Sequence, residues 1–251
     1  MQRVMNLVVD IGNTLIKAAV VEHDEVVMMQ QVGSVEDVDF AALVERFPAM
    51  HRAIVASTAV PTAEVAMLLR HKGFDVLEMT FTTPTPIGNA YASPETLGVD
   101  RLAAAVAAVE VIGCRDCLVV DFGTAITIDL VEDGVYRGGN ISPGVRTRFR
   151  ALHDYTSRLP ECSPTDEELE YGSTTRQAIE QGVMQGITYE IEGYISHFSA
   201  QNVKISLIFT GGDAKYFVKR IKNAIFANCE LVICGLNRIL EYNASIEQAN
   251  N

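Results

Sequence analysis

The chain has 251 residues, 48% of them hydrophobic, which is enough for a large core in one domain or two. Asp and Glu number 32 against 20 Lys and Arg, so the formal net charge is −12, and no Lys/Arg-rich block is present. This balance argues against a nucleic-acid partner. The longest apolar stretch, 102–109, is far too short to span a membrane, so no membrane association is expected.

Five cysteines and five histidines form no pattern typical of a metal site. Cys114 and Cys117 make a single CxxC pair with no second pair at zinc spacing. Asp10 interrupts the apolar run near the N-terminus, which excludes the core of a signal peptide. We therefore expect ordinary reduced thiols in a cytoplasmic protein.

The first half of the chain predicts the order β-β-β-α-β-α-β. Hydrophobic patterning and turn residues place these elements at 4–10, 14–22, 25–32, 35–47, 53–57, 61–71 and 74–79. A long stretch rich in Thr, Pro and Gly, 80–97, is expected to be a loop, and loops of this length are often functional. An alanine-rich helix over 101–111 follows and ends at Gly113.

The second half repeats the β-rich opening. Strands are predicted at 118–121, 126–131, 135–141 and 203–209, and helices after Pro143-Gly144, over 174–199, after the turn 210–213 and over 236–246. The polar stretch 155–172 is expected to be a loop. Each half thus begins with strands and continues with alternating helices and strands. This repeated order predicts an α/β fold with mixed sheets in two domains, 1–113 and 114–251.

One short pattern occurs twice, at 8–14 (VVDIGNT) and at 119–125 (VVDFGTA), with Asp10 and Asp121 at matching positions 111 residues apart. Each copy ends a strand in Asp-x-Gly and continues into a second β-rich run. The carboxylate can hold a metal ion or its water, and the glycine lets backbone N–H groups approach a phosphate. One copy alone is more often a plain β-turn. The duplication favours two phosphate-binding hairpins facing each other across a nucleotide.

Three further segments allow two readings each. Gly98-Val99-Asp100-Arg101 places an acid and a base at a helix start, where Asp is also a good cap and Arg a solvated neighbour. Its position just after the long loop favours a functional role. The glycine-rich turns 138–144 and 210–213 suit either a ligand lying against a helix start or a tight bend.

Taken together, these motifs resemble the ordered signatures of type III pantothenate kinases. The matching segments are 10–17 (DIGNTLIK), 55–61 (VASTAVP), 98–101 (GVDR), 121–125 (DFGTA), 138–144 (GGNISPG) and 210–213 (TGGD). They extend over residues 4 to about 215, most of the chain. Each one is weak alone, but five or more in this order are specific.

The resemblance implies two ribonuclease-H-like domains of the superfold shared by acetate and sugar kinases, Hsc70 and actin. It implies ATP-dependent phosphorylation of pantothenate to 4'-phosphopantothenate, the first step of coenzyme A biosynthesis. It further implies a homodimer, Mg²⁺ accompanying ATP, and a monovalent cation, K⁺ or NH₄⁺.

The resemblance also assigns roles to residues. The first phosphate loop, which binds ATP together with Thr124, would consist of Asp10, Ile11, Gly12, Asn13, Thr14, Leu15, Ile16 and Lys17. Asp121 would hold the monovalent cation. Pantothenate would be bound by Tyr91, Gly98, Val99, Asp100 and Arg101, with Asp100 as general base. Thr175 would reach the substrate of the partner subunit, although Thr174 adjoins it and Arg176 departs from the apolar residue expected there.

Two other functions remain open from the residues alone. Another kinase or a polyphosphate hydrolase of the same superfold would also need two phosphate-binding hairpins, but it would not predict Gly-x-Asp-Arg after a Tyr-bearing loop. A non-catalytic relative could bind nucleotide and regulate or scaffold a partner. The presence of Asp100, Arg101 and Asp121 favours catalysis.

Overall fold

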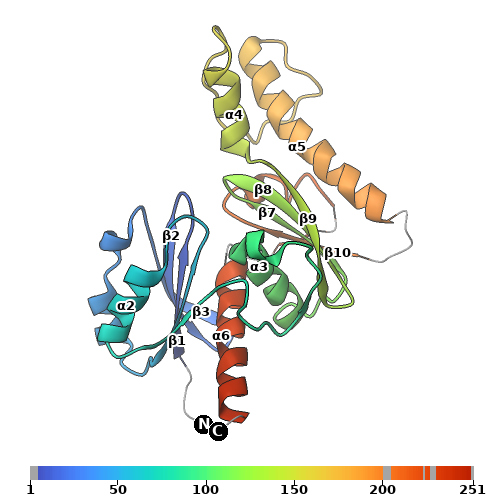
Figure 1. Cartoon of the computed structure of the whole chain (residues 1–251). Helices are drawn as coiled ribbons and strands as arrows, with labels where there is room; N and C mark the ends of the chain where they lie inside the picture. The colour runs from blue at the N-terminus through green and yellow to red at the C-terminus, as the bar shows by residue number, and fades with distance from the viewer. Residues whose placement is uncertain (1–4, 200–204, 223, 227–229, 250–251) are drawn as a thin grey trace. The chain divides into compact units, whose positions relative to one another are not determined.

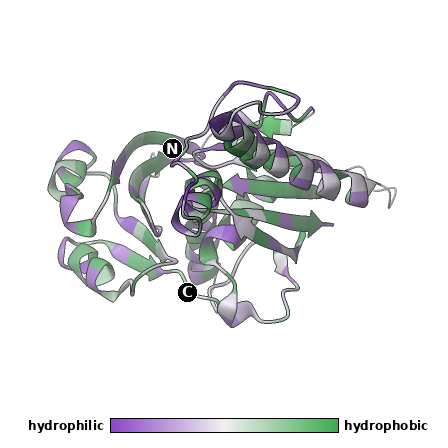
Figure 2. Ribbon diagram, turned by 90° about the horizontal axis from the view of Figure 1, so that it is seen from above, coloured by the Kyte–Doolittle hydropathy of each residue, from purple (hydrophilic) through white to green (hydrophobic). Residues whose placement is uncertain are grey.

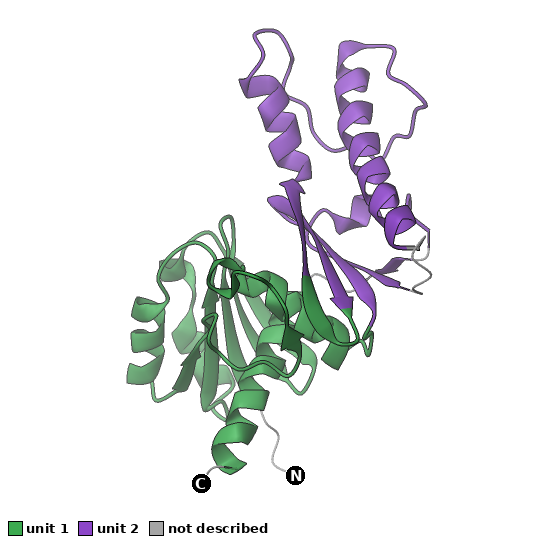
Figure 3. Cartoon of the chain, turned by 45° about the vertical axis from the view of Figure 1, so that its right-hand side comes forward, with its two compact units in different colours: residues 1–115, 132–137, 230–251 green, residues 116–131, 138–229 purple. Residues whose placement is uncertain are grey.

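The computed structural model describes residues 5–199, 205–222, 224–226 and 230–249 (Figure 1). Figure 3 shows the two compact units into which the chain folds. Unit 1 comprises 1–115, 132–137 and 230–251, and unit 2 comprises 116–131 and 138–229. Each unit therefore contains segments that lie far apart in the sequence.

Unit 1 is built on a five-stranded mixed sheet with the order β3-β2-β1-β4-β5. The strands are β1 (Met5–Ile11), β2 (Ile16–Glu22), β3 (Glu25–Val32), β4 (Arg52–Ser57) and β5 (Asp75–Glu78). The central strand β1 pairs antiparallel with β2 and parallel with β4. Its buried apolar side chains reach both faces, as a strand covered on both sides requires.

Helices cover both faces of this sheet. They are α1 (Phe40–Arg46), α2 (Ala63–His71), α3 (Val99–Glu110) and α6 (Leu231–Ala249), with short 3₁₀ turns at Val35–Asp37 and Pro94–Thr96. Leu7, Val9 and Ile11 pack into a core with residues of α1 and α2. The alternate residues of β1 face the other way, where the amide of Asn6 donates to Asn237 of α6 at 2.8 Å.

The helices α3 and α6 pack closely against each other. A Cβ atom at Gly235 of α6 would overlap the carbonyl oxygen of Ala103 in α3. The alanine-rich sequence of α3 allows the same approach from the other side, and its residues 101–109 are all buried. This close contact explains the small residues of α3 on the side that meets α6.

Unit 2 contains strands ordered β11-β10-β7-β8-β9, of which β9 belongs to this unit from Gly138 on. They are β7 (Cys117–Phe122), β8 (Ala125–Glu132), β9 (Val135–Pro143), β10 (Ser206–Thr210) and β11 (Ala224–Phe226). The helices α4 (Val145–Asp154) and α5 (Thr175–Ser199) and a 3₁₀ turn at Ala214–Tyr216 accompany them. Val120 and Phe122 of β7 share one core with side chains of α4 and α5. In Figure 2 the strands contain many residues in the green of the hydrophobic end of the scale.

The predicted α/β class with mixed sheets is confirmed, while several local predictions were wrong. The helix expected over 35–47 is divided, because Asp39 caps α1 by accepting from the N–H of Ala42 at 2.9 Å. The turn 210–213 leads into a 3₁₀ turn, not a longer helix. Two short strands, β6 (Gly88–Asn89) and β11, were not predicted. Val4 and residues 203–204 of two expected strands lie outside the described residues.

The last helix begins at Leu231, not at Leu236, and belongs to the same compact unit as β1. The division into domains at Gly113 stays a prediction. Within the described parts of the chain, no helix is long and apolar enough to cross a membrane.

Candidate active site

The first hairpin carries Asp10 at the end of β1 and Lys17 at the start of β2. The two residues lie opposite each other in the antiparallel register. The N–H of Gly12 donates to the carbonyl oxygen of Leu15 at 3.1 Å and closes the turn. Residues 13–15 of this turn are exposed, as a loop that receives a ligand must be. The structure therefore forms the predicted hairpin with its carboxylate at the base and its tip in solvent.

The side chain of Asp10 is buried, which is unusual for a carboxylate. Burial raises its pKa to about 6, Lys17 opposes that rise, and the nearby Asp100 adds to it. Alternation along β1 explains the neighbourhood, because Asp10 shares a face with Asn6, the residue that bonds to α6. The helix α3, which contains Asp100, packs on α6. Two motifs that are 90 residues apart in the sequence thus meet in unit 1.

Asp100 and Arg101 lie in the first turn of α3. One carboxylate oxygen of Asp100 accepts the backbone N–H of Arg101 at 2.8 Å. A Cβ atom at Gly98 would lie 2.5 Å from that same oxygen, so only glycine leaves room for this orientation. Gly98 is the N-cap residue, which means that Asp100 is not the helix cap of the simpler reading. Val99 is the first residue of the helix.

Arg101 is only 6% exposed, although it carries a full charge. The centre of its guanidinium group lies 5.9 Å from the ring centre of Tyr91, within the range of a cation–π contact. Tyr91 belongs to the long loop that precedes α3. The structure therefore places three of the predicted substrate residues, Tyr91, Asp100 and Arg101, side by side in unit 1.

The second hairpin, β7–β8, repeats the arrangement in unit 2. Asp121 lies opposite Thr127, and the N–H of Gly123 donates to the carbonyl oxygen of Ala125 at 3.1 Å. Asp121 also points away from the main core of its unit, since its neighbours Val120 and Phe122 are part of that core. The two copies of the sequence repeat are thus alike in the orientation of the aspartate, while the turn of the second copy is one residue shorter.

Two glycine-rich turns meet this second hairpin. The carbonyl oxygen of Thr124 accepts the N–H of Gly144 at 3.0 Å and the hydroxyl of Thr147 at 2.8 Å. Gly211 has a φ of +93°, and a Cβ atom there would overlap the carboxylate of Asp121. The turns 138–144 and 210–213 therefore gather around Asp121 and Thr124.

Two basic residues near this cluster were not predicted. Burial raises the pKa of Asp213, and the positive charges of Arg146 and Lys215 oppose that rise. Arg146 is exposed in the first turn of α4, directly after the glycine-rich turn. The sequence could have identified Arg146, because this charged residue follows the glycine-rich turn by only two positions.

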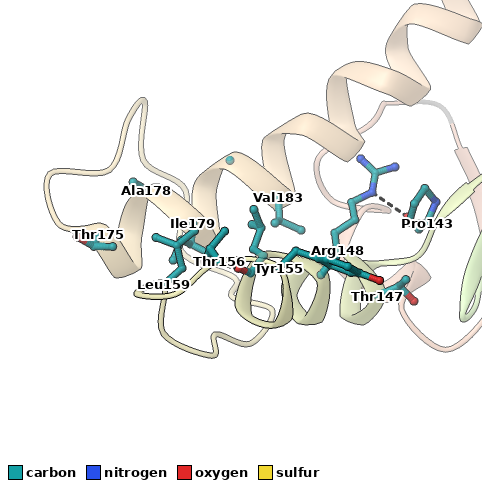
Figure 4. Close-up of a pocket in the computed structure, with 13 residues that line it drawn as sticks. Pro143, Thr147, Arg148, Tyr155, Thr156, Leu159, Thr175, Ala178, Ile179 and Val183 are labelled. Atoms are coloured by element: carbon teal, nitrogen blue, oxygen red, sulfur yellow. Dashed lines mark hydrogen bonds between the residues drawn. The ribbon is translucent and has the colours of Figure 1, made fainter.

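Thr175 lies elsewhere in unit 2, at the beginning of α5. It lines one end of a cavity of about 760 Å³ between α4 and α5, and Pro143 and Arg148 lie at the other end (Figure 4). Arg148 donates to the carbonyl oxygen of Pro143 at 2.8 Å and pairs with Glu190 of α5. The remaining lining residues are mostly apolar or hydroxyl-bearing: Thr147, Ala151, Leu152, Tyr155, Thr156, Leu159, Ala178, Ile179, Gly182 and Val183.

Apolar residues at helical spacing along α5 pack into the core of their own unit. The buried residues of this set are Ile179, Val183, Ile187 and Ile191. The neighbouring Thr174 accepts the N–H of Gln177 at 3.2 Å through its hydroxyl, so it helps to start the helix. Only Thr175 of the two threonines lines the cavity.

Among the residues that the structure describes, no group of three or more His, Cys, Asp or Glu side chains is placed to hold a metal ion. The described cysteines, Cys114, Cys117, Cys162 and Cys234, are free thiols. Cys229 lies outside the described residues.

Sequence comparison places the chain beside one family. The family model of type III pantothenate kinase matches residues 6–197. A type III pantothenate kinase from Phocaeicola vulgatus is 42% identical over 241 residues, which are 95% of this chain and 99% of that protein.

Comparison with solved structures concerns the fold. The activator of the 2-hydroxyisocaproyl-CoA dehydratase from Clostridium difficile, with bound ADPNP, has a TM-score of 0.55 at 12% identity and covers 97% of both chains. MreB5 of Spiroplasma citri, bound to ADP, has a TM-score of 0.50 at 13% identity and covers 100% of both chains. These similarities confirm the predicted superfold of acetate and sugar kinases, Hsc70 and actin.

The buried Asp10 predicts a dependence of stability on pH. Its folded-state pKa of about 6 exceeds the unfolded value near 4, so its ionisation lowers the free energy of unfolding as the pH rises from about 4 to about 6. The free energy of unfolding of Asp10→Asn, relative to that of the wild type, should therefore rise by about 2–3 kcal/mol between pH 4 and pH 8. The comparison is made in buffer without nucleotide or Mg²⁺. The measurement is the thermal midpoint of both proteins at the two pH values.

The control for this prediction is Asp75→Asn, which removes a largely exposed carboxylate of the same unit. Its midpoint should follow the wild type at both pH values. Parallel pH profiles for Asp10→Asn and the wild type would show that burial does not shift the titration of Asp10.

Proposed function

The chain belongs to the type III pantothenate kinase family, whose activity is the ATP-dependent phosphorylation of pantothenate in coenzyme A biosynthesis, and we propose which of its residues carry out that reaction. The observation on which the proposal rests is the convergence in unit 1 of Asp10, Lys17 and Asp100. Arg101 and Tyr91 adjoin them. Phosphoryl transfer depends on positioning and on charge stabilisation more than on covalent chemistry, and this group supplies both.

Asp100 is the general base of the proposed mechanism. The primary hydroxyl of pantothenate attacks the γ-phosphorus of ATP in line, its proton passes to the Asp100 carboxylate, and the bond to the β-phosphate oxygen breaks to release ADP. The hydrogen bond from the Arg101 N–H and the contact with Gly98 hold the carboxylate in one orientation. A fixed orientation favours a base that must meet the hydroxyl at the moment of attack.

Arg101 binds the acidic end of the substrate. A guanidinium group offers several donors in a rigid fork that suits a carboxylate, and its burial at 6% exposure strengthens the interaction. Tyr91 lies against it and forms a further wall of the pantothenate site, together with the backbone of Gly98 and Val99. Lys17 and the N–H groups of residues 13–15 face the phosphates in unit 1, as Thr124 does in unit 2.

Cations complete the charge balance. Mg²⁺ bound with ATP would neutralise the phosphate oxygens, and the hard oxygen donor of Asp10 would suit that ion or its water. The raised pKa of Asp10 supports this assignment, because a buried carboxylate with that pKa is stabilised by added positive charge. We assign the K⁺ or NH₄⁺ ion to Asp121, which lies beside the turns of Gly123 and Gly211.

The working unit is proposed to be a homodimer in the cytoplasm. The cavity between α4 and α5 is open along exposed residues, among them Tyr155, which is 90% exposed. A second copy of the chain is the occupant that we propose for this face, with Thr175 reaching the pantothenate of its partner. The free thiols are consistent with a reducing compartment.

The reaction is tested with an Asp100→Asn variant in a coupled assay for ADP. Because the amide cannot accept the proton, kcat should fall by about a hundredfold or more while ATP binding stays nearly intact. Asp75→Asn in the same unit is the control and should keep wild-type turnover.

The same assay separates the alternatives when pantothenate is compared with sugars and acetate. ADP release that depends on pantothenate supports the proposal. Turnover only with a sugar or acetate would indicate another kinase of the superfold, and nucleotide binding without turnover would indicate a non-catalytic relative. Near-wild-type turnover of Asp100→Asn would show that Asp100 is not the base.

The monovalent cation is tested by replacing Asp121 with Ala. Activity of the wild type should require K⁺ or NH₄⁺, and the variant should lose both that requirement and most of its activity, since the carboxylate that holds the ion is gone. Asp154→Ala removes an exposed carboxylate of unit 2 and serves as the control. Full wild-type activity in a potassium-free sodium buffer would contradict the assignment.

Shared active sites are tested by subunit mixing. Thr175→Arg and Asp100→Asn subunits should each be inactive, and after exchange one site of each mixed dimer receives both wild-type residues, so activity should return. Thr174→Arg replaces Thr175→Arg in the control, because Thr174 does not line the cavity, and it should be active without mixing. Verified exchange with no recovered activity would show that each chain builds its site alone.

A further inference from the structure

The orientation of Arg101 depends on its surroundings in unit 1. A guanidinium group that is 6% exposed has little water to hold it, so neighbouring side chains determine where it points. The face of Tyr91, 5.9 Å away, is one of those neighbours. A contact that holds the ring of Tyr91 in place therefore also restricts the guanidinium group of Arg101 on that side.

Tyr91 lies in a loop with little regular structure of its own. Between β5 and α3 the described elements are only the two-residue strand β6 and the 3₁₀ turn Pro94–Thr96. A ring in such a loop is held in place only if something outside the loop supports it.

That support comes from the first residues of β9, which belong to the same compact unit. Gly88 and Asn89 of β6 pair in parallel with Val135 and Tyr136. The N–H of Ala90 donates to the carbonyl oxygen of Tyr136 at 2.9 Å. The backbone on the N-terminal side of Tyr91 is therefore attached to β9 up to the residue before it.

The ring of Tyr136 continues this support at the level of side chains. It is fully buried, and its centre lies 6.0 Å from that of the Tyr91 ring, with 52° between their planes. The distance is within the range of attractive aromatic pairs. In addition, the side chain of Asn89 accepts the N–H of Tyr91 at 3.0 Å. Tyr136, Tyr91 and Arg101 thus form one series of contacts that leads from the core to the substrate-binding arginine.

We propose that Tyr136 is a positioning residue for the substrate: its buried ring holds Tyr91, and through Tyr91 it sets the orientation of Arg101. It touches neither ATP nor pantothenate in this proposal. The inference rests on the proposed function for its effect on the reaction. Its effect on the loop, however, is independent of any activity.

The test compares Tyr136→Leu, which removes the ring, with Tyr136→Phe, which keeps it. The Leu variant should raise the KM for pantothenate by about tenfold, the scale of one lost aromatic contact, while the KM for ATP changes by less than about twofold. The Phe variant should stay close to the wild type in both constants. Equal increases of the two KM values would contradict a role for Tyr136 that is specific to pantothenate.

Phe74→Leu provides a matched control for lost core packing. Phe74 is a buried aromatic residue of unit 1 that packs in the core formed with α1 and α2. Its replacement should lower the thermal midpoint as Tyr136→Leu does, but leave the KM for pantothenate unchanged. If Phe74→Leu raises that KM equally, the effect of Tyr136→Leu is general destabilisation and the proposal is wrong.

Two further measurements keep the inference separate from the proposed function. Hydrogen exchange of the amides of residues 88–97 should be faster in Tyr136→Leu than in the wild type, Tyr136→Phe or Phe74→Leu, whether or not the protein phosphorylates pantothenate. In a Tyr91→Leu background, Tyr136→Leu should add no further increase in the KM for pantothenate. Unchanged exchange of the loop, or fully additive effects, would overturn the proposal. Altered exchange in a protein without pantothenate-dependent turnover would overturn only the proposed function.

Discussion

The constraint on which the site of unit 1 depends is the placement of two carboxylates, Asp10 and Asp100, on one side of the sheet. Like charges repel, and Asp10 is in addition buried, so each effect raises the cost of ionising it. Lys17, opposite Asp10 in the hairpin, offsets part of that cost. Further positive charge would stabilise the ionised forms of both carboxylates. An acidic chain with a net charge of −12 that acts on phosphates must obtain that charge from bound cations and a few well-placed basic residues.

Close backbone packing makes this placement possible. Gly235 lets α6 approach the carbonyl oxygen of Ala103, and this contact brings α3 to the side of the sheet on which Asp10 lies. Gly98 then leaves room for the Asp100 carboxylate to turn back over the start of α3. In unit 2, Gly211 has the same relation to Asp121. In both units a glycine therefore lies against a carboxylate, so the position of each carboxylate depends on a residue that has no side chain.

Sequence patterns predicted the elements that carry their own signal. The Asp-x-Gly hairpins, the alanine-rich α3 and the long α5 each show a period or a turn residue, and each was found near its predicted position. The two-residue strand β6 has too few residues for any period, and the association of α6 with β1 depends on packing between distant segments. The burial of Arg101 was not predictable either, because a charged residue at a helix start is usually solvated.

The partners of a functional residue are harder to predict than the residue itself, and unit 1 shows the physical reason. The pattern Gly-x-Asp-Arg identifies Asp100 and Arg101 by local chemistry, but Tyr136 has no local feature that distinguishes it from any other aromatic residue of a strand. Its relation to Tyr91 exists only because β6 pairs with the start of β9 in one register, which places Asn89 beside Tyr136. A shift of β6 by one residue would place a different residue of β6 beside Tyr136 and would carry Tyr91 away from its ring. The surroundings of Arg101 thus depend on a two-residue strand pairing that the sequence alone does not specify.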